Sequence, residues 1–241
     1  MPPILLIPGN MCNDRLWQPV ANRLAAEGHA VRHAPLLDQC SIASMADAVL
    51  ADVDRPVVAV GFSMGAIVAA ELARRVPHCI AALGLVAFNA SADLPERAAM
   101  RPCQQNAVRE GRLEAIVADE LKPNYLAQAN RSDTALLDIV MQMARSVGPE
   151  AFIAQSEALR LRDDLRVTLA GLAMPVMLTC GSEDRLCPPE WHRKWASIIG
   201  PNAKFAEIPA AGHLLPLEQP HALADVLLGW LAEETLCQTA F

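Results

Sequence analysis

Short apolar runs alternate with amphipathic stretches along the first 89 residues, and this alternation restricts the possible folds more than any other feature. The apolar runs, each of strand length, are Ile4–Ile7, Ala30–Leu36, Pro56–Phe62 and Ile80–Asn89. Apolar residues recur at helical spacing in the stretches between them, which are Leu16–Gly28, Ser41–Val53 and Met64–Val76. Strands and helices in this order form a parallel sheet with right-handed crossovers. The composition agrees, because 53% of the residues are hydrophobic but only 4% are aromatic, which suits a sheet buried on both faces.

The alternation stops after Asn89, and the next strand-like run, Pro175–Gly181, lies too far along the chain for a single crossover helix. Helical patterns fill the intervening segment, at Arg112–Leu121, Thr134–Ala144 and Pro149–Arg160. We therefore predict an inserted helical cap at residues 90–162, with residues 1–89 and 163–241 forming the core.

The rest of the chain adds one strand and one helix to this core. Ala203–Pro209 has the pattern of a last strand, and His221–Leu231 that of a closing helix. Together with Pro175–Gly181 and the four N-terminal runs, they predict an α/β fold with about six parallel strands flanked by helices.

Charge and composition argue against several classes of function. The net charge is −7 and no basic run occurs, so we expect no nucleic-acid partner, because binding phosphates requires clustered lysine and arginine. No apolar run reaches the ~18 residues of a membrane span, and the N-terminus lacks the basic start of a signal peptide. The seven cysteines are scattered, without a CxxC pair. We therefore expect a cytoplasmic protein with free thiols and no membrane partner.

The segment Gly61-Phe62-Ser63-Met64-Gly65 places a serine between two glycines, directly after a predicted strand and before a predicted helix. This pattern is typical of a nucleophile elbow, a sharp turn that holds a serine hydroxyl above the edge of the sheet. Glycines avoid the clashes that side chains would make in so tight a turn, and the nearby helix N-terminus favours negative charge. The alternative is an ordinary Gly-Ser turn, but the flanking strand and helix favour Ser63 as a nucleophile.

A serine nucleophile needs a base, and His213 is the best placed of the six histidines. It lies in a loop of small residues after the last predicted strand, whereas the other five have no supporting motif. The base in turn needs a carboxylate that fixes its tautomer and stabilises the imidazolium. Asp184, which follows the strand Pro175–Gly181, is our candidate, and its neighbour Glu183 is the rival.

Acyl transfer also needs hydrogen-bond donors for the negatively charged oxygen of the tetrahedral intermediate. We expect the backbone N–H of Met64, next after the nucleophile, to supply one donor, and that of Asn10, in the loop after the first strand, to supply the other. Apolar residues near these loops are candidates for the substrate pocket, namely Met11, Phe88, Leu186 and Leu214.

Four segments together resemble the α/β-hydrolase superfamily, specifically its small cap-bearing esterases, lactonases and C–C-bond hydrolases. They are the oxyanion loop LLIPGNMCNDRLWQPV, the elbow VGFSMGAIVA, the acid loop GSEDRLCPP and the histidine loop IPAAGHLLPLEQP. The likeness spans nearly the whole chain, and the order Ser63, Asp184, His213 is that of the family. Two departures stand out. Pro8 replaces the usual histidine of the oxyanion loop, and the first two antiparallel strands of the family are missing, which predicts six strands instead of eight.

The resemblance implies that Ser63 attacks a carbonyl with His213 as general base, that water then hydrolyses the acyl-enzyme, and that no cofactor or metal is needed. We expect a serine hydrolase of a small, apolar ester or lactone. The alternatives are a thioesterase, a C–C-bond hydrolase, or a non-catalytic ligand-binding protein on the same fold. We assign the cap arginines Arg97, Arg101 and Arg109 to solvated helix surfaces, although they could serve an anionic substrate. The expected partner is a small-molecule substrate, and the sequence leaves the oligomeric state open.

Overall fold

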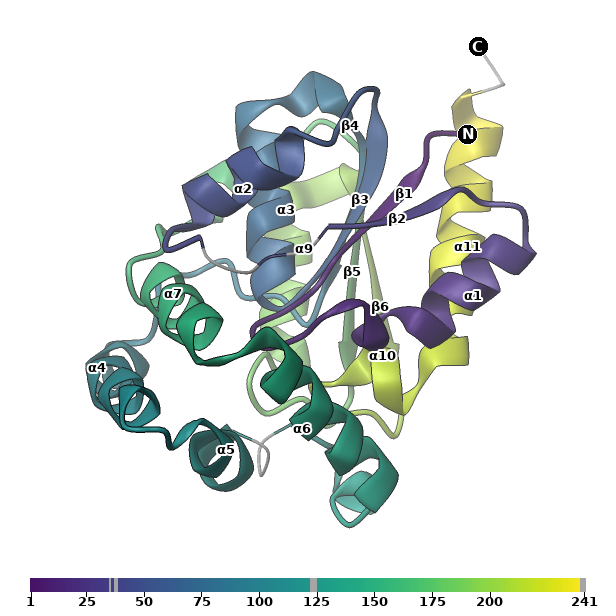
Figure 1. Ribbon diagram of the computed structural model, residues 1–241. Coiled ribbons are helices and arrows are strands. Elements are labelled where there is room, and N and C mark those ends of the chain that lie inside the picture. The colour runs from purple at the N-terminus through teal and green to yellow at the C-terminus, as the bar shows by residue number, and fades with distance from the viewer. Residues whose placement is uncertain (35, 37–38, 122–124, 239–241) are drawn as a thin grey trace.

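Six parallel strands of the described chain form one sheet in the order β2-β1-β3-β4-β5-β6 (Figure 1). This computed structural model describes residues 1–34, 36, 39–121 and 125–238. The strands are β1 (Ile4–Ile7), β2 (Val31–His33), β3 (Val57–Phe62), β4 (Ile80–Val86), β5 (Val176–Gly181) and β6 (Ala203–Ile208). The predicted α/β fold with a six-stranded parallel sheet is confirmed. Strand β2 is shorter than the predicted Ala30–Leu36, and position 35 of that prediction lies outside the described residues.

Helices cover both faces of the sheet. Successive residues of a strand point to opposite sides, and the strands carry apolar residues on both sides that must be buried. Along β1, Ile4 and Leu6 enter one core, whereas Leu5 and Ile7 enter the other. The helices of the first core are α1 (Gln18–Ala26) and α11 (Pro220–Gln238), and those of the second are α2 (Ile42–Leu50), α3 (Met64–Arg75), α8 (Arg166–Ala170) and α9 (Pro189–Ile199). Figure 1 shows α1 and α11 on one side of the sheet and α2, α3 and α9 on the other.

Polar side chains and glycine set the ends of several helices. Helix α2 begins with a capping box, in which Ser41 and Ser44 each accept a hydrogen bond from the backbone N–H of the other. Asp133 caps α6 (Thr134–Val147), and Gly148, with φ of 89°, separates α6 from α7 (Pro149–Arg160). The remaining short elements are η1 (Asp14–Leu16), η2 (Pro77–Cys79), η6 (Gly200–Asn202) and α10 (Leu215–Glu218). None of the described helices is both long enough and apolar enough to span a membrane.

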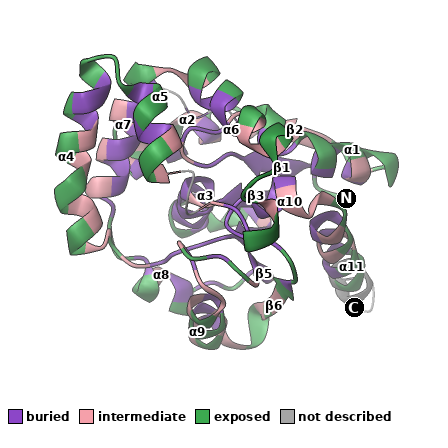
Figure 2. Cartoon of the chain, turned by 90° about the horizontal axis from the view of Figure 1, so that it is seen from below, coloured by how far each residue is buried: buried purple, intermediate pink, exposed green. Residues whose placement is uncertain are grey.

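The segment between β4 and α8 folds into helices that lie over the carboxyl ends of the strands (Figure 1). Its elements, apart from α6 and α7, are α4 (Pro95–Arg109), α5 (Leu113–Ala115), the π-helical turn η3 (Ile116–Leu121) and the 3-10 turn η5 (Gln128–Asn130). Helix α4 packs against α7, and its outer side is exposed (Figure 2). The sequence patterns did not predict α4, because charged residues and Pro102 interrupt its apolar stripe. Positions 122–124 of the predicted cap lie outside the described residues.

Candidate active site

The turn between β3 and α3 has the geometry of a nucleophile elbow. Ser63, at its centre, has φ of 52° and ψ of −111°, a conformation that residues other than glycine rarely adopt. A Cβ atom added to Gly61 would lie 2.2 Å from the carbonyl oxygen of Gly65, and one added to Gly65 would lie 2.4 Å from that of Ile7. Close packing of the backbone therefore requires glycine at both positions, and this packing holds Ser63 at the carboxyl end of the sheet.

Three residues from three strand ends form one hydrogen-bonded chain. His213 Nε2 lies 3.0 Å from Ser63 Oγ, and His213 Nδ1 lies 2.9 Å from Asp184 Oδ2. Asp184 and His213 are buried, whereas Ser63 is half-buried and borders a cavity. The ring of Phe62 contacts the imidazole from one side, with 5.1 Å between ring centroids. The structure thus brings together the predicted nucleophile, base and acid in the arrangement that proton transfer from a serine requires.

Asp184 is held as a carboxylate. Its Oδ1 accepts hydrogen bonds from the backbone N–H groups of Leu186 (2.8 Å) and Cys187 (2.9 Å), while Oδ2 faces His213. Burial alone would raise the pKa of Asp184. The charge of His213 and these hydrogen bonds outweigh it and lower the pKa below its ordinary value. A charged Asp184 favours the His213 tautomer that carries its proton on Nδ1, which leaves Nε2 free to take a proton from the serine.

Two glutamates connect the cap to the loops of the site. Glu183, the rival candidate for the acid, is exposed and accepts a hydrogen bond from the backbone N–H of Gln128 (2.8 Å) rather than from the histidine. Glu218 accepts hydrogen bonds from the backbone N–H groups of Gly212 (2.8 Å), next to the histidine, and of Ala127 (2.7 Å) in the cap. Burial raises the pKa of Glu218. The sequence did not lead us to expect that Glu218 would join the cap to the site. The only indication of such a role was the position of Glu218 in the histidine loop.

The two expected oxyanion donors, the backbone N–H groups of Asn10 and Met64, both belong to residues that line the cavity. Within the described chain, neither N–H has a hydrogen-bond partner. The loop is fixed from the cap by Gln155, a fully buried residue of α7. Its Oε1 accepts from Met11 N–H (2.8 Å) and Asn10 Nδ2 (3.0 Å), and its Nε2 donates to the carbonyl oxygen of Leu36 (2.6 Å). Sequence reasoning missed Gln155, because nothing in the pattern of α7 distinguishes it from a surface glutamine.

A cavity of about 280 Å³ lies over Ser63 and includes two of the four predicted pocket residues, Leu186 and Leu214. The prediction of Met11 and Phe88 as pocket residues is wrong. Met11 is buried in the core under α1 and α11, and Phe88 is buried in the core on the opposite face. Both are apolar and close to the site in sequence, but the backbone turns their side chains into the cores.

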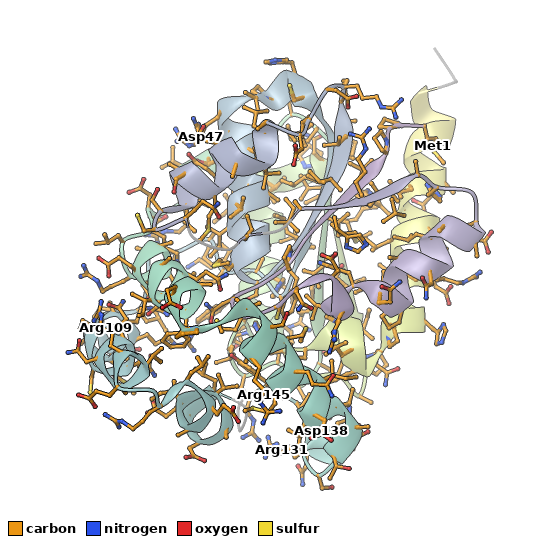
Figure 3. The ribbon with its side chains drawn as sticks, viewed as in Figure 1. Met1, Asp47, Arg109, Arg131, Asp138 and Arg145 are labelled. Atoms are coloured by element: carbon orange, nitrogen blue, oxygen red, sulfur yellow. The ribbon has the colours of Figure 1, made fainter. Side chains whose placement is uncertain are left out.

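The cap arginines divide between the cavity and the surface. Arg109 is exposed on α4, as expected, and Figure 3 shows it at the periphery of the molecule. Arg97 and Arg101, on the same helix, line the cavity, and so does Arg162, just after α7. The assignment of Arg97 and Arg101 to solvated helix surfaces is therefore wrong. Their position depends on how α4 packs against α7, which the sequence patterns did not predict.

Among the described residues, only one group of three or more has metal-ligand types close together, and it consists of Asp184, Cys187 and His213. Two of the three belong to the hydrogen-bonded chain with Ser63. Burial raises the pKa of the Cys187 thiol well above its ordinary value, so the thiolate that a metal requires is disfavoured. The donor set therefore fits proton transfer better than metal binding.

Comparison with known proteins agrees with this geometry. Residues 4–226 match the model of the "Alpha/beta hydrolase family". A pimeloyl-[acyl-carrier protein] methyl ester esterase of Methylococcus capsulatus is 33% identical over 174 residues, covering 70% of this chain and 67% of the relative. A Serratia proteamaculans protein provisionally named a carbamate hydrolase, RutD, is 27% identical over 99% of this chain and 94% of its own length. The solved structure of a thermophilic esterase from Thermogutta terrifontis, with malate bound, superposes with a TM-score of 0.86 at 27% identity and covers 97% of this chain and 90% of its own.

Proposed function

The chain belongs to the alpha/beta hydrolase family, and on this basis we propose that it is a serine hydrolase that cleaves a small carboxylic ester or lactone through an acyl-enzyme on Ser63. The observation that carries the proposal is the hydrogen-bonded chain from Ser63 through His213 to Asp184 at the edge of a cavity. A non-catalytic ligand-binding protein would not need these three groups aligned, or a serine held in a strained backbone conformation.

In the first half of the reaction, Ser63 Oγ forms a bond to the carbonyl carbon and its proton passes to His213 Nε2. The N–H groups of Asn10 and Met64 donate hydrogen bonds to the oxygen that becomes negative, and Asp184 stabilises the imidazolium. His213 then gives the proton to the leaving oxygen as the carbon–oxygen bond breaks, which releases an alcohol. In the second half, water attacks the acyl-enzyme with the same proton transfers and releases the acid.

The size of the cavity supports a small substrate, because about 280 Å³ lies just below the volume of typical ligand pockets, about 300–1,000 Å³. The cavity that Ser63 borders also has an apolar lining from Met64, Ile67, Leu186 and Leu214, which suits a short hydrocarbon acyl chain. The names of two relatives, a methyl ester esterase and an esterase, support an ester as the bond that is cleaved.

The test is a turnover screen of methyl esters, lactones and acyl-thioesters of short acids against three proteins. These are the wild type, Ser63→Ala, and Ser132→Ala as a control at an exposed serine of the cap. We expect the wild type and Ser132→Ala to hydrolyse esters or lactones equally fast. We expect Ser63→Ala to lose at least about 10³-fold in kcat, because removing a nucleophile that acts as a unit with its base removes most of the rate. Undiminished turnover by Ser63→Ala would refute the proposed nucleophile, and turnover confined to thioesters would reassign the substrate class.

A further inference from the structure

The cavity over Ser63 contains more positive charge than ester hydrolysis needs. Arg97, Arg101 and Arg162 all line it, and one buried carboxylate, that of Asp93, binds two of them. Asp93 Oδ2 lies 2.6 Å from Arg101 Nε, and Asp93 Oδ1 lies 3.0 Å from Arg162 Nη1. Asp93 is the one described carboxylate that forms ion pairs within this group of three arginines, and Arg97 forms none with the described residues.

Arg162 and Asp93 form the fixed part of this cluster. Their side chains are only 6% and 2% exposed, and Arg162 Nε also donates to the carbonyl oxygen of Ser91 (3.0 Å). The pair joins the segment before α4 to the end of α7. Burial lowers the pKa of Arg162, and the positive charges of Arg101 and Arg97 lower it further against the opposing effect of Asp93. The guanidinium of Arg162 is therefore occupied by the protein, whereas the other two arginines retain free donors.

Two donors at the cavity lack a partner among the residues that the structure describes. Arg97, which is half-buried, makes neither a hydrogen bond nor an ion pair with them. Asn89, after β4, is 6% exposed, and its Nδ2 is buried without a hydrogen-bond acceptor, while its Oδ1 accepts from the backbone N–H of Ser91 (2.9 Å). Buried donors are nearly always paired with protein, water or another ligand, and this amide belongs to a residue that lines the cavity. Glu120, the one acidic side chain in the described lining, is exposed and accepts a hydrogen bond from Gln104 (2.7 Å).

We propose that Arg97, Arg101 and Asn89 form a subsite for a carboxylate group of the substrate, and that the enzyme hydrolyses monoesters of short dicarboxylic acids. The inference rests on the proposed ester hydrolysis at Ser63 and names its substrate class. One end of such a substrate presents the ester carbonyl to Ser63, and the other end receives hydrogen bonds from the arginine and amide donors. Water is consumed, and an alcohol and a dicarboxylate are released.

A carboxylate fits these donors better than an apolar group does. An arginine fork binds a planar carboxylate through two N–H groups, and hydrogen bonds to charged groups are the stronger ones. An apolar end would leave the half-buried Arg97 guanidinium desolvated and unpaired, which opposes binding. The apolar residues that line the same cavity, among them Leu186 and Leu214, suit the short methylene chain of a diacid, so the expected apolar acyl group becomes the middle of the substrate.

The experiment compares monomethyl glutarate with methyl 5-methylhexanoate, in which an isopropyl group replaces the carboxylate, on the full-length protein. Arg97→Met tests the subsite, and Arg109→Met, on the exposed side of the same helix, is the matched control. We expect Arg97→Met to lower kcat/KM for monomethyl glutarate by about 10- to 100-fold, as for the loss of a hydrogen bond to a charged group. We expect it to change kcat/KM for the neutral ester by less than about 3-fold, and Arg109→Met to change neither. An Arg97→Met variant that affects the two esters equally overturns the subsite.

Calorimetric titration with glutarate separates this inference from the proposed function, because binding needs no turnover. Glutarate should bind the wild type and Arg109→Met but bind Arg97→Met at least about 10-fold more weakly, with an affinity that falls as salt is added. If this holds but no ester is hydrolysed, the subsite stands and the proposed function fails. If Ser63-dependent hydrolysis of the neutral ester is found while glutarate binds wild type and Arg97→Met equally, the function stands and the subsite fails.

Discussion

Gln155 connects the cap to the oxyanion loop, and its replacement by leucine should show whether the cap positions that loop for catalysis. Leucine has a similar size, so the change removes hydrogen bonds and leaves little cavity. It deprives Met11 N–H and Asn10 Nδ2 of their shared acceptor, and the carbonyl oxygen of Leu36 of its donor. All of these bonds converge on one fully buried side chain.

The expected cost follows from the groups left unpaired. Each buried backbone group without a partner costs about 1–3 kcal/mol, so two of them should lower the free energy of unfolding by about 2–6 kcal/mol. A domain has about 5–15 kcal/mol in total, so the variant should remain folded only at moderate temperature and denaturant concentration. Loss of one oxyanion donor costs about 10²–10³-fold in kcat in a studied protease. In Gln155→Leu the Asn10 N–H is displaced but not removed, so it should still stabilise the oxyanion in part. We therefore expect kcat to fall by about 10- to 100-fold.

The assay measures kcat and KM on the best methyl ester of the screen, together with urea unfolding of the same samples. The matched control is Gln142→Leu, because Gln142 is exposed on α6 and accepts a hydrogen bond from Arg15 Nη1 (2.6 Å), so it also joins the cap to the N-terminal segment. The control should change stability by less than about 0.5 kcal/mol and leave kcat unchanged. If Gln155→Leu keeps the wild-type kcat, whether or not it loses stability, the cap does not position the oxyanion loop for catalysis.

Two further predictions concern Asp184 and His192. Asp184→Asn should lower kcat by about 10³–10⁴-fold, because His213 loses the partner that fixes its tautomer. Glu183→Gln should lower kcat by less than about 3-fold. The reverse result in steady-state kinetics would make Glu183 the acid. His192 is buried, its Nε2 accepts a hydrogen bond from Phe88 N–H (2.8 Å), and burial lowers its pKa to about 4. Between about pH 4 and 6.5 the unfolded state therefore binds more protons than the folded state. The free energy of unfolding, measured in urea, should fall by about 2 kcal/mol from about pH 7 to pH 5. If the stability of a His192→Gln variant depends on pH as steeply as that of the wild type, this prediction is contradicted.

The sequence predicted the sheet well because buried parallel strands have a strong, local pattern. All six strands are found close to their predicted positions, since several of them are continuous apolar runs, and Ile4–Ile7 and Val176–Gly181 end at proline or glycine. The predicted elbow, acid and histidine likewise lie on loops that directly follow strands. Because the strands are parallel, their carboxyl ends meet at one edge, and Ser63, Asp184 and His213 come together there.

The sequence was less informative where the structure depends on packing between distant segments. Gln155 and Arg97 are polar residues on cap helices, and a polar residue on an amphipathic helix is normally expected to face water. Their burial depends on how α4 and α7 sit over the strand ends, which no local pattern encodes. Met11 and Phe88 show the converse, because an apolar residue beside a catalytic loop can enter the core or the pocket, and here both enter the core.

The central claim is that Ser63 is a nucleophile activated by His213. Its most direct test is the mass of the intact protein, followed by peptide mapping, after treatment with a fluorophosphonate. We predict one adduct per chain on the peptide that contains Ser63, no adduct on Ser63→Ala, and slow labelling of Asp184→Asn. An adduct on another residue, or equal labelling of Ser63→Ala and the wild type, would contradict the account.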